Sequence, residues 1–97
     1  MLRLYKITGN SLNPEYQEGD FVLATTVPFL FRSPRPGDVV ILRHPAYGTL
    51  IKRLTRIDAD GFEVGSDAPG AVDSRVFGAL PLRYLTGRVI ARIRGRR

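Results

Sequence analysis

The sequence contains no cysteine, no tryptophan and only one histidine, His44. Without cysteine the chain has no disulfide bonds, no thiolate metal ligands and no cysteine nucleophile. A single histidine is too few for a histidine-based metal cluster. We therefore expect a protein that has no metal site and needs no other cofactor.

Long apolar segments are also missing. No segment approaches the roughly 20 consecutive apolar residues that a membrane-spanning helix requires. The residues Met1–Lys6 place a charged or polar group at every other position, and they lack the hydrophobic region of a signal peptide. These two absences predict a cytoplasmic protein.

The length and composition indicate one globular domain. With 97 residues, 43% hydrophobic and 25% charged, the chain has room for one core, and we assign residues 1–97 to a single domain. The net charge of +6 raises the question of nucleic-acid binding. However, the sequence has no aromatic-rich RNA-binding signature, no zinc-finger spacing and no helix-turn-helix pattern. We expect no nucleic-acid partner, and a non-catalytic basic β-barrel that binds nucleic acid stays open as an alternative.

Most of the chain has the alternating or β-branched pattern of short strands. Asp58–Gly61 is typical of a hairpin turn. One short helical turn is also expected, with Asn13 as its cap, Pro14 as its first residue and Gly19 as the residue that ends it. Short strands with closely spaced turns predict a compact all-β domain, barrel-like or sandwich-like, with that helical turn. The expected strands cover residues 2–7, 21–27, 39–42, 50–57, 62–64 and 87–94.

A serine and a lysine have the context of a nucleophile and its base. Ser11 follows the first strand, and a serine hydroxyl reacts only when a neighbouring group takes its proton. A lysine can do this only while it is uncharged. Strand alternation places Lys52 on the same face as Leu50 and Leu54, where apolar surroundings lower the pKa of an amine. The sequence therefore suggests a Ser-Lys dyad.

Four segments follow one another along the chain: Thr8–Pro14 with Gly19-Asp20, Pro36–Val40, Ile51–Leu54, and Gly65–Asp67 with Asp73–Gly78. In this order they resemble the boxes of the signal peptidase I-like serine protease family (S26). The resemblance implies the catalytic core of the signal peptidase/LexA type without a membrane anchor or a large inserted β domain. This trimmed form is similar to the mitochondrial inner-membrane proteases and to the proteases proposed to mature nickel-type superoxide dismutase.

The resemblance implies a serine endopeptidase that removes an N-terminal leader or propeptide from a protein, with a nickel-type superoxide dismutase as a candidate substrate. Ser11 would attack the scissile carbonyl while neutral Lys52 takes its proton and then passes it to the leaving amine. Asp73 and Arg75 would form a buried ion pair that supports the lysine-bearing strand. The substrate would bind as an extended strand against the strands of the site, with small side chains before the cut.

Two positions depart from the family pattern. Gly9 stands where many relatives have a hydroxyl side chain that helps to bind the oxyanion, so the Ser11 backbone N–H would need help from another backbone group or from the Asn10 amide. Ala71 stands where the family commonly has a serine that orients the lysine amine. We therefore expect Ala71→Ser to raise the turnover rate. An unchanged or reduced rate would mean that another group, Ser66 or an ordered water, already orients Lys52.

Two further interpretations stay open. A LexA-type self-cleaving domain shares the Ser-Lys chemistry, although Asp73–Arg75 fits the signal peptidase group better. The residues Phe29, Leu30 and Phe31 either pack in the core or, beside the basic segment Arg32–Arg35, form a peripheral membrane contact or a patch that docks a partner.

Overall fold

The structure is a computed structural model that describes residues 1–9, 12, 15–30, 32–67, 70 and 72–95. In this part of the chain, six antiparallel strands form one sheet in the order β1-β2-β6-β3-β4-β5, which confirms the all-β prediction. The elements are β1 (Leu2–Lys6), β2 (Phe21–Thr25), β3 (Val39–His44), β4 (Gly48–Asp58), β5 (Gly61–Gly65), α1 (Ser74–Phe77), the 3-10 turn η1 (Leu82–Tyr84) and β6 (Leu85–Ile93).

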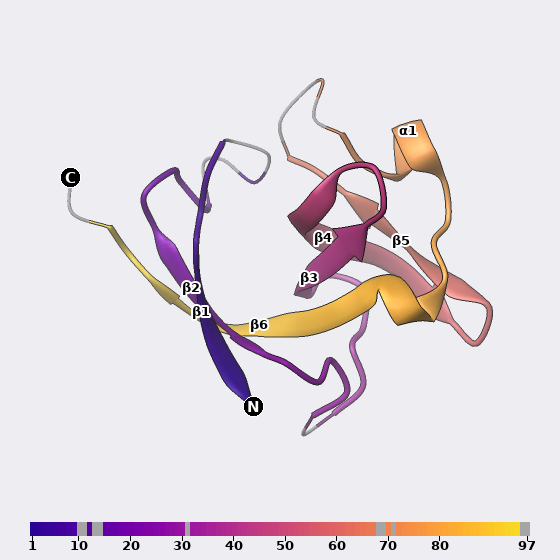
Figure 1. The fold of residues 1–97 in the computed structure, drawn as a ribbon, viewed down its shortest axis with the longest axis horizontal. Helices are drawn as coiled ribbons and strands as arrows, with labels where there is room; N and C mark the ends of the chain where they lie inside the picture. Colours follow the sequence, from indigo (N-terminus) through magenta and orange to yellow (C-terminus); the bar gives the residue numbers. More distant parts are fainter. Residues whose placement is uncertain (10–11, 13–14, 31, 68–69, 71, 96–97) are drawn as a thin grey trace.

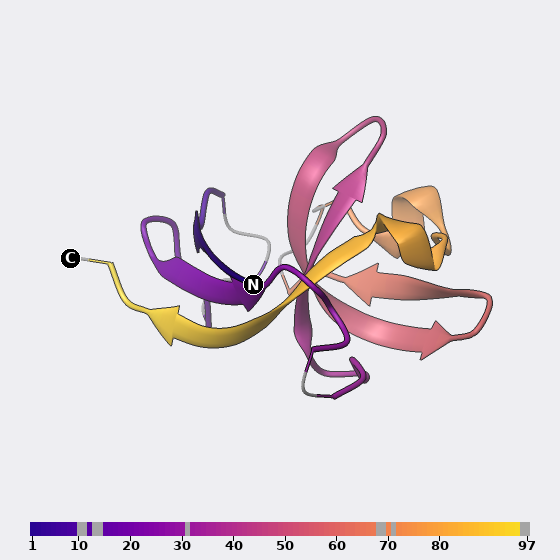
Figure 2. The ribbon, with the colours of Figure 1, turned by 60° about the horizontal axis from the view of Figure 1, so that its bottom comes forward.

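Strand β6 joins the two halves of the sheet. Its first residues pair with β3 and its last residues pair with β2. Figure 1 and Figure 2 show β3, β4 and β5 grouped around the start of β6, and β1 and β2 around its end. Gly87 lies near this crossing, where an added Cβ would be 2.3 Å from the carbonyl oxygen of Thr25. The close approach of the two backbones therefore requires glycine at this position.

The main core lies in the half formed by β3, β4, β5 and the start of β6. Backbone hydrogen bonds of 2.9 Å in both directions between Phe62 and Leu80 bring the segment before β6 back onto β5, which makes this half barrel-like. Strand β3 is buried on both faces, as its unbroken apolar sequence predicts for a central strand. The buried cluster contains Val40, Leu42, Leu54, Phe62, Val64, Leu80 and Leu85.

Every expected strand range overlaps an observed strand, and the expected hairpin turn joins β4 to β5. The expected helical turn includes Asn13 and Pro14, which are outside the described residues, but across it the Tyr16 N–H donates a 3.0 Å hydrogen bond to the Leu12 backbone oxygen, the spacing of one helical turn. A second short helix was not predicted: this is α1, which begins after Asp73. The carboxylate of Asp73 caps it by accepting a 2.9 Å hydrogen bond from the Arg75 N–H. A helix of four residues has no periodic pattern, which explains why the sequence did not predict it. No helix in the described part of the chain is long and apolar enough to cross a membrane.

Candidate active site

Lys52 is buried on β4. It lies opposite Val40 of β3, and only 4% of the residue is exposed. Leu54, two residues along the same strand face, is also buried, while Leu50 is half-buried. Burial lowers the pKa of the Lys52 amine, and the Asp73 carboxylate acts in the opposite direction by raising it. More of this lysine is therefore uncharged at a given pH than of an exposed lysine.

The Lys52 amine has a hydroxyl partner that was not among the predicted site residues. Its Nζ donates a hydrogen bond to Oγ of Ser66, with an N···O distance of 2.9 Å. Ser66 follows the end of β5, and its own backbone N–H donates to Oδ2 of Asp73 at 3.1 Å. From the sequence, Ser66 was the alternative to a serine at position 71, to be considered if Ala71→Ser did not raise the rate, because the residue that commonly orients the lysine in that family aligns with Ala71.

Asp73 and Arg75 form an ion pair, but it is not the fully buried pair that we expected. Asp73 is 1% exposed, whereas the Arg75 side chain is 67% exposed. The guanidinium donates from Nε to Oδ1 at 3.0 Å and from Nη2 to Oδ2 at 2.9 Å. These hydrogen bonds hold the pKa of the Asp73 carboxyl below its usual range, while burial acts to raise it. The two residues differ in burial because the Asp73 carboxylate caps the start of α1 inside the protein, whereas the Arg75 side chain approaches that carboxylate from the solvent side.

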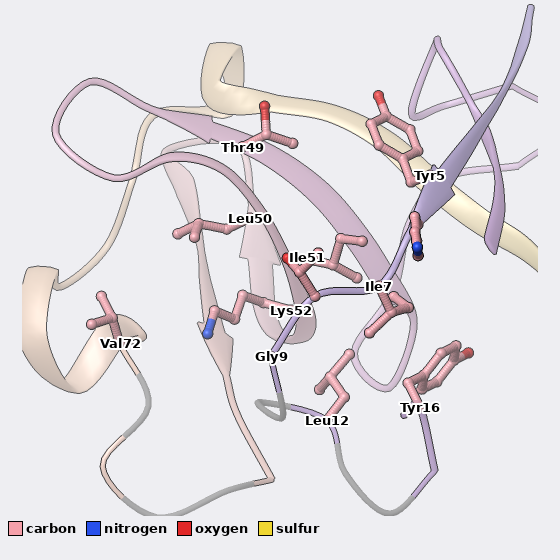
Figure 3. A pocket seen from close by; sticks show the side chains of 12 residues that line it. Tyr5, Ile7, Gly9, Leu12, Tyr16, Thr49, Leu50, Ile51, Lys52 and Val72 are labelled. Atoms are coloured by element: carbon pink, nitrogen blue, oxygen red, sulfur yellow. The ribbon is translucent and has the colours of Figure 1, made fainter. Parts of the chain in front are cut away.

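A cavity of about 480 Å³ lies between β4 and the residues that end and follow β1. Its lining consists of residues 5–9, Leu12, Tyr16, residues 49–52 and Val72. Figure 3 shows the Lys52 side chain projecting into this space, with Leu12 and the backbone of Gly9 nearby. Gly9 and Leu12 precede and follow Ser11 closely in the sequence. The predicted residues Asn10, Ser11 and Ala71 lie outside the described residues.

Of the two residues predicted to help bind the oxyanion, Gly9 is among the described residues and Asn10 is not. Gly9 has a φ of 81° and its N–H donates to Oε1 of Glu18 at 3.1 Å, so this N–H already has a carboxylate acceptor. A positive φ of this size favours glycine over residues with a side chain. The participation of Gly9 and Asn10 in oxyanion binding stays a prediction.

The segment after Ser11 is tied to β4 and β6 by two arginines. Arg53 is the neighbour of Lys52 on the opposite face of β4, and its Nη2 donates to Oε1 of Glu15 at 2.5 Å. Arg92 of β6 donates to the backbone oxygen of Glu15 and lies over the ring of Tyr16, 5.5 Å from its centroid. These contacts join residues far apart in the chain, and no local sequence pattern could have predicted them.

The predicted membrane contact falls on a loop that is partly exposed. Phe29 is exposed and Leu30 is half-buried, while Phe31 lies outside the described residues. The backbone oxygen of Leu30 accepts a 2.6 Å hydrogen bond from Nη2 of the buried Arg88, which fixes the loop to β6. Arg32 pairs with Asp38 at 2.9 Å. Contact with a membrane through this loop stays a prediction.

No group of three or more histidine, aspartate or glutamate residues within the described ranges is arranged to hold a metal ion. His44 lies against the rings of Tyr47 and Phe77, at centroid distances of 5.0 and 4.9 Å, and is not part of the cavity lining. The groups that the structure places around Lys52 are the Ser66 hydroxyl, which accepts a hydrogen bond from the amine, and the Asp73 carboxylate, which raises the pKa of the amine.

Comparison with known proteins gives two matches. The chain is 30% identical over 63 residues to signal peptidase I V of Bacillus subtilis (strain 168). The aligned segment covers 65% of this chain and 38% of that protein. The chain thus spans well under half the length of the curated relative that it matches. The sequence model described as Peptidase S24-like matches residues 2–90. Both matches support a serine peptidase in general. Because the family match extends over nearly the whole chain and the fold is all-β, the chain belongs to the Peptidase S24-like family.

Proposed function

We propose that this protein is a serine endopeptidase in which Ser11 is the nucleophile and Lys52 is the general base. The observation that carries the proposal is the shared cavity: Lys52 projects into it, and Gly9 and Leu12, which flank the segment containing Ser11, line it. A base must reach the proton that it removes, and a buried amine is a stronger candidate than an exposed one because its neutral form is favoured.

The reaction follows from the two groups. Neutral Lys52 accepts the hydroxyl proton as Ser11 Oγ bonds to the scissile carbonyl carbon, and the resulting ammonium gives this proton to the leaving amine. A water molecule then attacks the acyl-enzyme carbonyl while Lys52 takes its proton, and Lys52 returns that proton to Ser11 Oγ as the ester C–O bond breaks and the second product leaves. The backbone N–H of Ser11 is the first candidate donor to the oxyanion.

A protein substrate would bind as an extended strand. In the described part of the chain, β5 pairs with β4 only from Arg53 onward, so residues 49–52 have no strand partner on that side. This edge and residues 5–9 border the cavity. An unpaired strand edge accepts a peptide through backbone hydrogen bonds. The substrates that we propose are N-terminal leaders or propeptides, with the precursor of a nickel-type superoxide dismutase as the first to examine.

The absence of cysteine permits a test that needs no substrate. Ser11→Cys introduces the only thiol, and a nearby ammonium would lower its pKa and speed its alkylation. We expect iodoacetamide to label Ser11→Cys faster, and down to lower pH, than it labels Ser11→Cys/Lys52→Ala. Equal rates at every pH would show that Lys52 does not act on residue 11.

Activity is tested with precursor proteins and mass spectrometry of the products. Ser11→Ala and Lys52→Ala should each abolish cleavage, and the double variant should be no worse than either, because residues that act as one unit are non-additive. Turnover by either single variant would contradict the assignment. Fragments of the enzyme itself that form at a rate independent of its concentration would instead indicate a LexA-type self-cleaving domain.

A further inference from the structure

The pairing of β4 with β5 places one particular hydroxyl beside Lys52. Near the turn, Asp58 lies opposite Gly61 and Ile57 opposite Phe62, a register that would set Lys52 against Asp67 if it continued unchanged. The register shifts by one residue between Leu54 and Arg56, and Leu54 then lies opposite Val64 and Arg53 opposite Gly65. Continued by one residue, the shifted register sets Lys52 against Ser66. The 2.9 Å hydrogen bond from Nζ to Oγ is the result.

Ser66 is itself held in place. Its backbone N–H donates to the buried Asp73 carboxylate at 3.1 Å, and the next helix residue, Ser74, accepts a 2.8 Å hydrogen bond from the N–H of Val64 through its Oγ. The end of β5 and the residue that follows it are therefore attached to the start of α1 at two points. A side chain fixed in this way can hold a flexible amine in one rotamer, whereas an unattached hydroxyl would move with it.

The direction of the hydrogen bond matters for a base. A neutral amine has one lone pair, and a hydrogen bond in which the amine donates to Ser66 Oγ leaves that lone pair available for the proton of a nucleophile. An amine with no acceptor would sample rotamers that point the lone pair away from the nucleophile.

We propose that Ser66 is a positioning residue that orients the Lys52 amine. It would replace the serine that the family commonly has at the position of Ala71. The inference rests on the proposed function, because it assumes that Lys52 is the base. It also revises the expectation for Ala71. Since the amine already has a hydroxyl partner, Ala71→Ser should leave the turnover number unchanged rather than raise it.

The first test reads the lysine directly and does not depend on catalysis. The chain has only two lysines, Lys6 and Lys52, so protein labelled with 13C at lysine Cε gives two signals, and exposed Lys6 serves as an internal control. An ammonium bonds a hydroxyl acceptor more strongly than a neutral amine does. Loss of the acceptor in Ser66→Ala should therefore lower the pKa of Lys52 by on the order of one unit, with the Lys6 signal as the reference in the same sample. Ser66→Thr, which keeps the hydroxyl, should behave as the unmodified protein.

The second test is the pH profile of cleavage. In Ser66→Ala we expect kcat on the plateau to fall by about 2- to 10-fold, the scale of one hydrogen bond, with an acid limb that moves to lower pH. Ser66→Thr should restore both. Ser33→Ala is the matched control, because it removes a serine hydroxyl in the loop between β2 and β3, outside the cavity lining. It should leave both kcat and the acid limb in place.

Each result has one meaning. An unchanged Lys52 titration in Ser66→Ala overturns the proposal, and so does a raised pKa, which would mean that Ser66 donates to the lone pair. If the Lys52 signal shifts as expected but the unmodified protein cleaves no precursor and iodoacetamide labels Ser11→Cys independently of Lys52, the proposed function fails while the contact between Ser66 and Lys52 stands.

Discussion

The Asp73 carboxylate is buried, and the Arg75 guanidinium that pairs with it at 2.9 Å remains largely in solvent. The two partners of this ion pair therefore contribute differently to stability. Asp73 also accepts hydrogen bonds from the backbone N–H groups of Ser66 and Arg75, so it holds together the end of β5 and the start of α1. Arg75 makes its described hydrogen bonds to Asp73 alone.

We expect Asp73→Ala to destabilise the protein by about 2–4 kcal/mol, since it removes a helix cap and leaves partly buried N–H groups without their acceptor. Arg75→Ala should cause a clearly smaller loss, because the exposed guanidinium is screened by water and Asp73 keeps its backbone donors. Urea unfolding at neutral pH measures both. Equal losses of stability in the two variants would mean that the ion pair, rather than the helix cap, provides the stabilisation at the junction of β5 and α1.

The stability contributed by Asp73 should depend on pH. Its pKa in the folded protein lies below the value of about 3.9 for an unfolded chain. The contribution is therefore fully present above about pH 4 and disappears as the pH falls through the folded-state pKa. In urea unfolding, the stability difference between the unmodified protein and Asp73→Asn should be largest near neutral pH and shrink toward pH 3. A constant difference would contradict the lowered pKa.

The activity should rise with pH as Lys52 loses its proton. Because burial lowers the pKa of Lys52, the midpoint of the acid limb should lie below the value of about 10.4 for a free lysine. Asp73 raises that pKa, so Asp73→Asn should move the limb to lower pH. Asp60→Asn, which removes a carboxylate from the exposed β4-β5 turn, is the control and should leave the limb in place. A profile that stays flat well into acid would exclude Lys52 as the base.

The ion pair between Glu15 and Arg53 should affect activity more than stability. It links the segment that follows Ser11 to the residue after Lys52, but Glu15 is half exposed, so the coupling energy in unfolding should be about 0.2–1 kcal/mol. A double-mutant cycle with Glu15→Gln and Arg53→Gln measures this coupling in both urea unfolding and kcat. We expect each single variant to lower kcat and the double variant to cost less than the sum. Additive kcat losses would show that the pair does not position the segment.

Gly87→Ala should be destabilising by about 1–3 kcal/mol or more, because its Cβ would lie 2.3 Å from a backbone oxygen that cannot move without separating β2 from β6. Gly65→Ala is the comparison, since its Cβ would meet only the methyl group of Thr55 at 3.2 Å. Thermal unfolding of both variants should show the larger drop for Gly87→Ala. The reverse order would mean that the two halves of the sheet can shift at the crossing.

The sequence alone determined the features that depend on neighbouring residues. Alternation along residues 50–57 predicted a strand with Lys52 on the same face as Leu54, and both are buried there. The turn residues of Asp58–Gly61 predicted the β4-β5 hairpin. Such patterns repeat every two residues or lie within one turn, so they can be recognised without knowing where the rest of the chain lies.

Only the tertiary structure decided which residues meet around Lys52. The register set at the hairpin turn would bring Asp67 opposite the lysine, and the shift between Leu54 and Arg56 brings Ser66 instead. The contact between Arg53 and Glu15 joins residues 38 positions apart. A bulge and the paths of distant segments result from packing over the whole sheet, and a shift of one residue exchanges a carboxylate for a hydroxyl beside the amine without changing any local pattern.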